Sequence, residues 1–461
     1  MKKQCLTILG ILISSIMFAQ SGHIMQGVGA VNMSMGGAAT AQPLDINGAI
    51  LWNPAAISAF DNKIISLSAG AFFSSPQLSS SIPAGMLGEE MPGVSGTIED
   101  ELGTSILPAI AYVWGKPESK HTFGISAFGI SGFGVDFPEE KNSPLAGASF
   151  NPNESSSPIS YPQAANGFGH IKSNYMLLQV SLTYAYKIND NLSFGLQPNF
   201  DYEALEMAPN PTTSPDFTGK GYPVTDKASA MGYGAQFGLF YDSHKLLKLG
   251  VSYKTKQYFS EYTFKNTYLD GSSAPENSFT MNYPAILSFG LGLSANKFDF
   301  AADFRLVDYE NTEGFAEKGW VINGDKDSPY FGYPTGAVKG FGWENMTILS
   351  LGLQYKLTEN LPVRFGYTYN TNPINNELAF FSVSAPAVIT NAAQIGFGYK
   401  AGKLDFNLVY HKGFRGDGNK GKLLNPLLID PETNPYGAIP GTSVSYDMET
   451  SMIQLTVNYK L

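Results

Sequence analysis

The chain contains one cysteine in 461 residues, and this residue, Cys5, lies close to the start. If the segment around it is removed on export, no thiol remains for disulfides, thiolate catalysis or a cysteine-based zinc site. Charge is also scarce, because Asp, Glu, Lys and Arg make up 15% of the residues and the formal net charge is -10. A negatively charged protein is a poor partner for nucleic acid, so we expect no nucleic-acid binding.

The first 19 residues have the pattern of a signal peptide. Lys2 and Lys3 form a short basic start, an apolar run extends from Leu6 to Phe18, and Ala19 offers a small residue for cleavage. We expect residues 1–19 to be removed after export. Cys5 precedes that cleavage point, so it would not be the first mature residue and is a poor site for lipid attachment. No later stretch provides about 18 uncharged apolar residues, so we expect no membrane-spanning helix after the signal.

Many segments of the chain alternate between apolar and polar residues with a period of two. In the final segment, MIQLTVNYKL, the odd-numbered residues from Ile453 to Leu461 are apolar and the residues between them are mostly polar. Successive side chains of a strand point to opposite faces, so one face of such a strand can meet lipid and the other a lumen. The segments ILSLGLQYKL (348–357) and FDFAADFRL (298–306) repeat this pattern.

Fourteen segments alternate in this way, and the connections between them are short turns and long loops in alternation. Closed barrels are the β structures that satisfy backbone polar groups in lipid, and an even strand count with this alternation of loop lengths is typical of them. The sequence therefore predicts an all-β, 14-stranded antiparallel transmembrane β-barrel in the outer membrane of a Gram-negative type of cell, with a soluble sandwich or propeller as the alternative. The expected strands are 63–75, 105–116, 121–133, 173–188, 191–205, 229–243, 246–262, 279–295, 297–309, 343–358, 360–371, 390–401, 403–412 and 446–461.

A barrel of this size encloses a lumen that wall side chains alone do not fill. Residues 20–62 precede the first strand, lack clean alternation and carry little charge. We therefore expect residues 20–62 to form an N-terminal hatch, or plug, inside the lumen of the barrel formed by residues 63–461. Near the end of the hatch, Asn53 can cap a short helix that has Pro54 at its first position.

Two hatch segments carry a family resemblance. SMGGAATA (34–41), followed by WNPAAISAF (52–60), resembles the hatch of the FadL/TodX family of outer-membrane transporters for long-chain fatty acids and other hydrophobic compounds. NYPAILSFGLGLSANKFDFAADFRLVDYEN (282–311) and VRFGYTYNTNPINN (363–376) also resemble family segments, so the resemblance covers essentially the whole mature chain. The hatch or gate residues to which it points are Gly36, Gly37, Asn53, Pro54 and Ala55.

The resemblance implies a mechanism. Long-chain fatty acids or aromatic hydrocarbons would be captured among extracellular loops and taken up passively into an apolar lumen pocket. The hatch would then shift, and the ligand would leave sideways beside an irregular third strand.

The third expected strand, 121–133, has a fault in its alternation. Odd-numbered residues are apolar as far as Ala127, and the apolar phase then moves to Phe128 and Ile130, with Gly129 and Gly132 close by. A phase slip with glycine is typical of a bulge or kink. We therefore expect a kink over Ala127, Phe128, Gly129 and Gly132; the alternative is glycine tolerated in a regular, curved strand.

Inward positions near the extracellular ends of several strands are apolar. A water-filled porin would carry polar residues throughout its lumen, so this pattern disfavours an ion-selective pore. The alternative is that these side chains pack against infolded loops. Arg305 or Lys400 could pair with the carboxylate of a fatty acid. The candidate lumen ligand-binding residues are Leu177, Ile286, Val307, Ile348, Val409, Met448 and Met452.

Motifs for catalysis are missing. GDGNKGK (416–422) lacks the Ser or Thr of a phosphate-binding loop, NGDKD (323–327) lacks the spacing of a calcium loop, and no Gly-x-Ser-x-Gly is present. We expect no enzyme activity, no catalytic residue, no metal and no cofactor.

The expected partners are a hydrophobic ligand, outer-membrane lipid and, because of the alternating C terminus, the barrel-assembly machinery during biogenesis. We expect a monomer. The alternative function is an outer-membrane barrel that serves as a shuttle or attachment component of a protein-secretion system.

Overall fold

Strands dominate residues 22–416 and 418–461, which are the residues described in the computed structural model of the protein. The expected signal peptide, residues 1–19, lies outside the described residues. Over the described ranges, no helix has both the length and the apolar character needed to cross a membrane.

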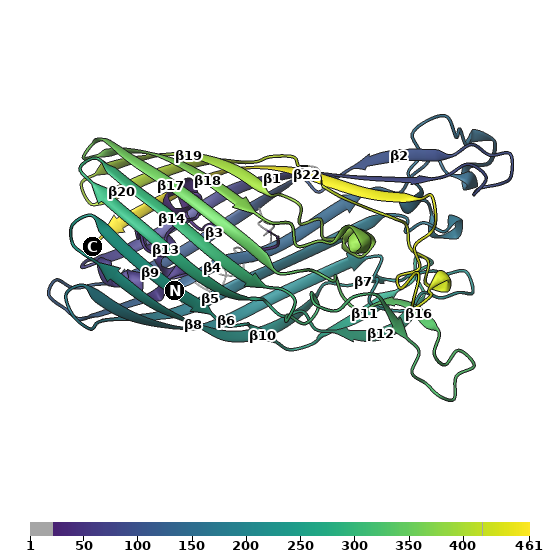
Figure 1. The fold of residues 1–461 in the computed structure, drawn as a ribbon, viewed down its shortest axis with the longest axis horizontal. Helices are drawn as coiled ribbons and strands as arrows, with labels where there is room; N and C mark the ends of the chain where they lie inside the picture. The colour runs from purple at the N-terminus through teal and green to yellow at the C-terminus, as the bar shows by residue number, and fades with distance from the viewer. Residues whose placement is uncertain (1–21, 417) are drawn as a thin grey trace.

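Fourteen strands form a closed antiparallel ring (Figure 1). The ring closes because the last strand pairs with the first, from Ile64 opposite Lys460 to Ser81 opposite Ser443. Closure pairs the first and last strands with each other, so neither presents an open edge to lipid, where an unpaired N–H or C=O finds no water. The expected fold class is therefore confirmed. In order round the ring, the strands are β1 (Lys63–Ile82), β3 (Thr104–Trp114), β4 (His121–Phe137), β5 (Ile171–Lys187), β6 (Leu192–Ala208), β8 (Ala228–Asp242), β9 (Leu247–Lys254), β13 (Ala285–Ala295), β14 (Phe298–Asp308), β17 (Met346–Thr358), β18 (Leu361–Asn370), β19 (Asn391–Ala401), β20 (Leu404–Gly413) and β22 (Ser443–Lys460).

The alternation in the sequence corresponds to the two faces of the wall. In β22, Ile453 and Leu455 are 51% and 49% exposed, whereas Gln454 and Thr456 are buried. Apolar side chains therefore cover the outside of the ring, where lipid would lie, and polar side chains of the same strand point inward.

The two ends of the barrel differ (Figure 1). Tight turns and the C terminus lie at one end, and the long loops with their own short elements lie at the other. The short elements of the barrel other than the fourteen ring strands are β2 (Val94–Glu99), β7 (Val224–Thr225), β10 (Tyr258–Phe259), β11 (Tyr262–Thr267), β12 (Ser273–Phe279), β15 (Trp320–Ile322), β16 (Pro334–Val338) and β21 (Asn419–Gly421), with the 3₁₀ helices η2 (Pro144–Ser149), η3 (Pro158–Ser160), η4 (Gln163–Ala165), η5 (Asn376–Ser382) and η6 (Pro426–Leu428).

The predicted boundaries of two strands, 246–262 and 279–295, are wrong at the ends that lead into the long loop between them. β9 stops at Lys254 and β13 begins only at Ala285. Pro284 has no N–H to donate to a ladder, which explains why regular pairing between these neighbours does not continue past it. Only an isolated bridge joins Gln257 to Tyr283, and β10 turns to pair with β8 instead.

Residues 22–62, called the hatch below, lie inside the ring. Helix α2 (Ala30–Ser34) packs against β18, β19, β20 and β22, whereas the 3₁₀ helix η1 (Pro54–Ala59) packs against β4, β5, β6 and β8 on the other side of the ring. Helix α3 (Ile46–Trp52) contacts β1, β3 and β4. From Gly22 to Ser58, every residue is buried except Pro43 and Leu44, which are half-buried.

The wall carries glycine where the hatch backbone approaches it most closely. A Cβ on Gly366 of β18 would stand 2.2 Å from Gly36 N, and a Cβ on Gly250 of β9 would stand 2.0 Å from Thr40 O. Both separations are far below van der Waals contact, so a larger residue at either position would push the hatch away from the wall.

Gly366→Ala should therefore unseat the hatch beside β18. We expect the purified variant to conduct more ions than the wild-type protein in planar lipid bilayers, because the displaced hatch opens the lumen. Phe365→Ala is the matched control, since the neighbouring Phe365 side chain is 50% exposed on the lipid face. Equal conductance of the wild-type protein and both variants would contradict this prediction.

Candidate functional site

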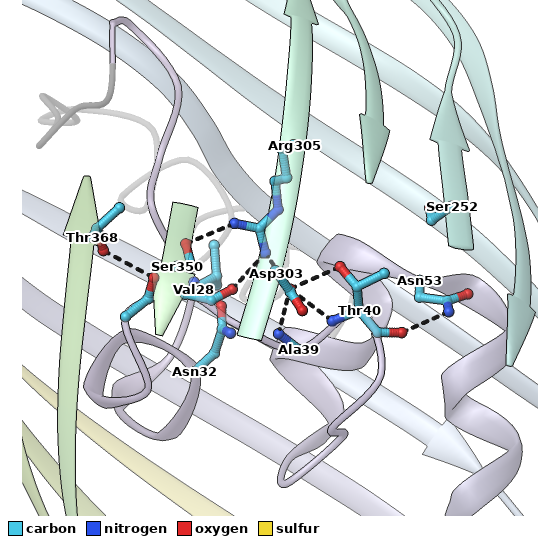
Figure 2. Close-up of polar contacts among 12 residues, drawn as sticks. Val28, Asn32, Ala39, Thr40, Asn53, Ser252, Asp303, Arg305, Ser350 and Thr368 are labelled. Atoms are coloured by element: carbon cyan, nitrogen blue, oxygen red, sulfur yellow. Dashed lines mark hydrogen bonds and ion pairs between the residues drawn. The ribbon is translucent and has the colours of Figure 1, made fainter. Parts of the chain in front are cut away.

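Asp303, an inward residue of β14, holds the hatch backbone (Figure 2). Its Oδ2 atom accepts hydrogen bonds from Ala39 N at 2.8 Å, from Thr40 N at 2.9 Å and from Thr40 Oγ1 at 2.8 Å. Hydrogen bonds to an ionised acceptor are stronger than neutral ones, so this single carboxylate fixes one turn of the hatch to the wall.

Arg305, two residues further along β14, completes this contact. It pairs with Asp303 Oδ2 at 2.6 Å and donates to Gly37 O at 2.8 Å and to Ser350 Oγ at 3.0 Å. Its guanidinium also lies 3.7 Å from the ring centroid of Trp52, in cation–π contact. Asp303 and Arg305, called the latch below, are both buried, and the attraction between them and to the hatch offsets their loss of hydration.

Gly36 and Gly37 form the turn that the latch grips. Their φ angles are +67° and +80°, which side chains other than glycine rarely adopt. Gly37 N donates to Asn32 O at 3.0 Å, and Gly36 O accepts from Thr368 Oγ1 of β18 at 2.9 Å.

Asn53 joins two arms of the hatch to the wall. Its Nδ2 atom donates to Thr40 O at 2.8 Å and to Leu239 O of β8 at 3.0 Å (Figure 2 shows the bond to Thr40). Its Oδ1 atom accepts from Ala55 N at 3.0 Å, and Pro54 takes the first position of η1, so the expected cap is present. The side-chain amide of Asn53 therefore holds the end of the hatch against β8 and close to Thr40, which the latch also binds.

The ladder between β3 and β4 stops part-way along β4. Pairing runs from Trp114 opposite Phe123 to Ala109 opposite Phe128. On its other edge β4 pairs with β5 as far as Phe137, with a register shift between Gly129 and Ser131. β4 is thus neither regular nor fully paired over the interval in which the sequence predicts a kink.

The start of the hatch occupies the edge that β3 leaves. Met25 N donates to Ile130 O at 3.0 Å, and His23 O accepts from Gly132 N at 3.2 Å and from Ser131 Oγ at 2.7 Å. The bonds to Ile130 O and from Gly132 N satisfy backbone groups of β4 at the point where its phase slips, so residues 23–25 act there as a short substitute strand.

Aromatic rings surround the His23 side chain, which is fully buried. The Nδ1 atom of His23 and Tyr309 Oη are joined by a hydrogen bond of 2.7 Å. We call these rings the His23 cage, and its members are Tyr175, Tyr283, Tyr309, Phe315 and Trp343.

A second apolar site, called the loop pocket below, lies among the long loops. η5 connects it to the cage, because Phe380 and Phe381 line the pocket while Ser382 Oγ accepts from Trp343 Nε1 at 3.0 Å. The pocket is lined by Phe168, Ile171, Pro209, Pro211, Tyr222, Trp320, Val338, Phe380, Phe381, Val383 and Ser384.

The structure buries all seven expected lumen residues but divides them between two clusters. Val409 and Met452 pack in a cluster that includes Met25 and Met33 of the hatch. The other five, which belong to the large cluster shared with the cage and the loop pocket, are Leu177, Ile286, Val307, Ile348 and Met448. None of the seven lines the loop pocket.

The basic residues expected to meet a carboxylate have other environments. Arg305 belongs to the latch, and Lys400 is exposed. Lys254 at the end of β9 was not expected to have a role, yet it is 2% exposed, donates to Gln179 Oε1 at 3.2 Å and lies 5.8 Å from the ring centroid of Tyr283. Among the described residues, no group of three or more His, Cys, Asp or Glu side chains could hold a metal ion.

A profile described as "Outer membrane protein transport protein (OMPP1/FadL/TodX)" matches residues 162–414, more than half of the chain. The chain belongs to this family. The resemblance seen in the sequence is thereby confirmed, and this FadL/TodX family member is an outer membrane transport protein. A search of curated protein sequences found no match.

Solved structures show the same fold at low sequence identity. The toluene transporter TodX of Pseudomonas putida matches with a TM-score of 0.64 and 17% identity, over 95% of this chain and 99% of that one. A FadL homologue of Pseudomonas aeruginosa gives 0.65 and 15% over 95% and 99%. The toluene transporter TbuX of Ralstonia pickettii gives 0.57 and 15% over 93% and 98%.

Breaking the latch should loosen the hatch. Asp303→Ala leaves Arg305 buried without its partner, which costs about 3–5 kcal/mol for a buried ion pair. We expect faster amide hydrogen exchange at residues 38–40, measured by mass spectrometry, and less effect in the double variant Asp303→Ala/Arg305→Ala. Phe304→Ala is the control, because Phe304 lies between the two on the lipid face. Exchange as slow in Asp303→Ala as in Phe304→Ala would contradict a latch.

Asn53→Ala should change ligand passage more than barrel stability. The substitution removes bonds within the hatch and to β8 but none between barrel strands. We expect altered uptake in cells with a melting temperature within a few degrees of the wild-type value. Asn62→Ala is a matched control, since the Asn62 amide donates to neighbouring Asp61 in an exposed position. Lowered melting with unchanged uptake would overturn this expectation.

Proposed function

We propose that this FadL/TodX family member carries hydrophobic small molecules, such as long-chain fatty acids or aromatic hydrocarbons, passively across the outer membrane. One observation carries the proposal: the ladder between β3 and β4 ends at Phe128, and hatch residues 23–25 cover the edge beyond it. A wall that is closed there only by the plug can open sideways when the plug moves.

The route begins in the loop pocket and continues through the His23 cage. Phe341 lies 5.5 Å from Phe315 of the cage and 5.9 Å from Phe133 of β4, measured between ring centroids. Aromatic surface therefore extends from the loops to the inner side of the irregular part of β4. Transfer of apolar surface out of water, worth about 25 cal/mol per Å², supplies the driving force for entry.

Two chemical groups fit this route. Lys254 is the buried cation beside the cage, so the carboxylate of a fatty acid would pair with it. A ring without charge would need only the aromatic walls. The names of TodX and TbuX give toluene as the compound that those relatives transport, which supports the second class for this chain.

Exit would require residues 23–25 to leave β4. The three hydrogen bonds that hold them involve Ile130, Ser131 and Gly132, where the register shift lies. A bulge bends its strand and leaves one residue unpaired, so this edge is easier to expose than a regular ladder.

Deletion of Ile130 tests lateral exit. Removing the extra residue should restore a continuous phase in β4 and allow it to pair further along β3. We expect uptake of radiolabelled oleate or toluene by cells to fall roughly tenfold or more, because gating steps often limit such rates. Ile130→Val keeps the bulge and is the control. Wild-type uptake by the deletion variant, with folded barrel in the membrane, would rule out this exit.

One observation favours the alternative role in protein secretion. The hairpin between β15 and β16 exposes Tyr330, Phe331 and Tyr333 by 69%, 50% and 62%, and exposed aromatic side chains are common at protein interfaces. Native mass spectrometry of the purified barrel separates the two roles. A stable protein complex without bound lipid would favour secretion, whereas co-purified fatty acid or hydrocarbon would favour uptake.

A further inference from the structure

We propose that a groove on the lipid face of the barrel binds one anionic phospholipid. The groove crosses β3, β4, β5 and β6 and lies toward the end that carries the tight turns (Figure 1). Its volume of about 450 Å³ is within the usual range for pockets that bind small ligands. The proposed function does not depend on this site, because the groove is outside the wall and the proposed route runs through the loops and the lumen.

Outward side chains of these strands form the walls of the groove. Three of them make a row of rings across the strands, since Trp114 lies opposite Phe123 and Phe123 lies opposite Tyr184. The next row away from the turns is aliphatic, with Ile125 opposite Leu182. Aromatic residues of a membrane barrel mark its interface with water. The groove therefore suits a lipid whose chain lies along the aliphatic row and whose polar end lies beyond the rings.

Pro198 explains why the surface is hollowed here. The ladder between β5 and β6 includes Ser181 opposite Asn199 and Tyr184 opposite Leu196, but not the residues between them. Proline has no N–H to donate, which interrupts such a ladder. Pro198 lines the groove at this interruption and is smaller than the other outward residues of β6. The backbone and a rigid ring therefore shape the floor, which does not depend on the rotamers of long side chains.

The wall under the groove is closed between β3 and β4. These strands pair continuously from Trp114 opposite Phe123 to Ala109 opposite Phe128. Hatch residues 23–25 bond to β4 at residues 130–132, which lie beyond that ladder. A lipid in the groove therefore lies away from the part of the wall proposed for lateral exit.

Basic side chains surround the turn end of the groove. Lys63 Nζ lies 5.3 Å from the ring centroid of Trp114, and His121 Nδ1 is joined to Tyr184 Oη by a hydrogen bond of 2.9 Å. Lys120 precedes His121 and is exposed. Within the described part of the chain, neither Lys63 nor Lys120 forms an ion pair. Both ammonium groups can therefore pair with a phosphate group at the membrane interface.

The excess of positive charge selects the class of lipid. Four lysines and three carboxylates lie in or next to the two tight turns at this end of the groove, so the net charge there is positive. Tight turns of outer-membrane barrels face the periplasm, where the leaflet consists of phospholipid. A phospholipid with a net negative charge is attracted to such a site more strongly than one whose headgroup is neutral overall. The charged residues are Lys63, Lys116, Lys120, Lys187, Asp61, Glu118 and Asp190.

Native mass spectrometry of the purified barrel tests the inference, with dioleoylphosphatidylglycerol as the probe. We expect the wild-type protein to bind one molecule more tightly than any further molecule. Lys63→Gln/Lys120→Gln should weaken this first step about tenfold, because two ammonium groups are lost from the interface. Lys245→Gln/Lys403→Gln is the matched control, since these exposed lysines belong to other tight turns. Dioleoylphosphatidylethanolamine should bind more weakly, because it has the same chains and no net charge.

The shape of the groove is tested separately by Pro198→Trp, which fills the hollow and leaves every charge in place. This variant should lose the tight step, whereas Phe406→Trp, on the lipid face of β20, should keep it. Equal binding of the two lipids by the wild-type protein would overturn the inference, even if a variant fails to fold. So would an unchanged first step in Lys63→Gln/Lys120→Gln or in Pro198→Trp, in barrels with the wild-type circular dichroism spectrum.

Discussion

Hydrocarbon offers no hydrogen-bond partner to a peptide group, so each strand in a membrane barrel needs a neighbour along both edges. β4 does not find this in β3 alone, because the ladder ends at Phe128 and the register shifts between Gly129 and Ser131. Residues 23–25 supply the missing partners from inside the lumen. The start of the hatch is therefore part of the wall, and the proposed movement of residues 23–25 would expose the edge of β4.

The remaining hatch contacts follow from the same need to satisfy buried polar groups. Asp303 of the latch accepts hydrogen bonds from the backbone N–H groups of residues 39 and 40. Thr368 donates to the carbonyl of Gly36, and Asn53 donates to two carbonyls. Each contact joins the hatch to a different part of the ring. Among these contacts of the described residues, the one at β4 replaces a barrel neighbour, which supports the proposed opening of the wall at that edge.

Aromatic side chains occupy the space between the loop pocket and this edge. They come from separate elements, including Phe133 on β4, Tyr175 on β5 and Trp343 before β17. A surface of this kind binds apolar rings without directional bonds. On the proposed route, a ligand would therefore pass between neighbouring positions of similar affinity.

The sequence by itself determined the number of strands, the two faces of the wall and the slip in β4, because period-2 alternation and glycine position are local properties of the chain. It also determined the cap at Asn53 and Pro54. Only the tertiary structure decided that Arg305 grips the hatch and not a ligand, that Lys254 is buried beside Tyr283, and that His23 lies in an aromatic cage. His23 and Tyr309 are 286 positions apart. Alternation predicts that a side chain points inward. The distant residue that it contacts depends on how the closed ring and the hatch fit together.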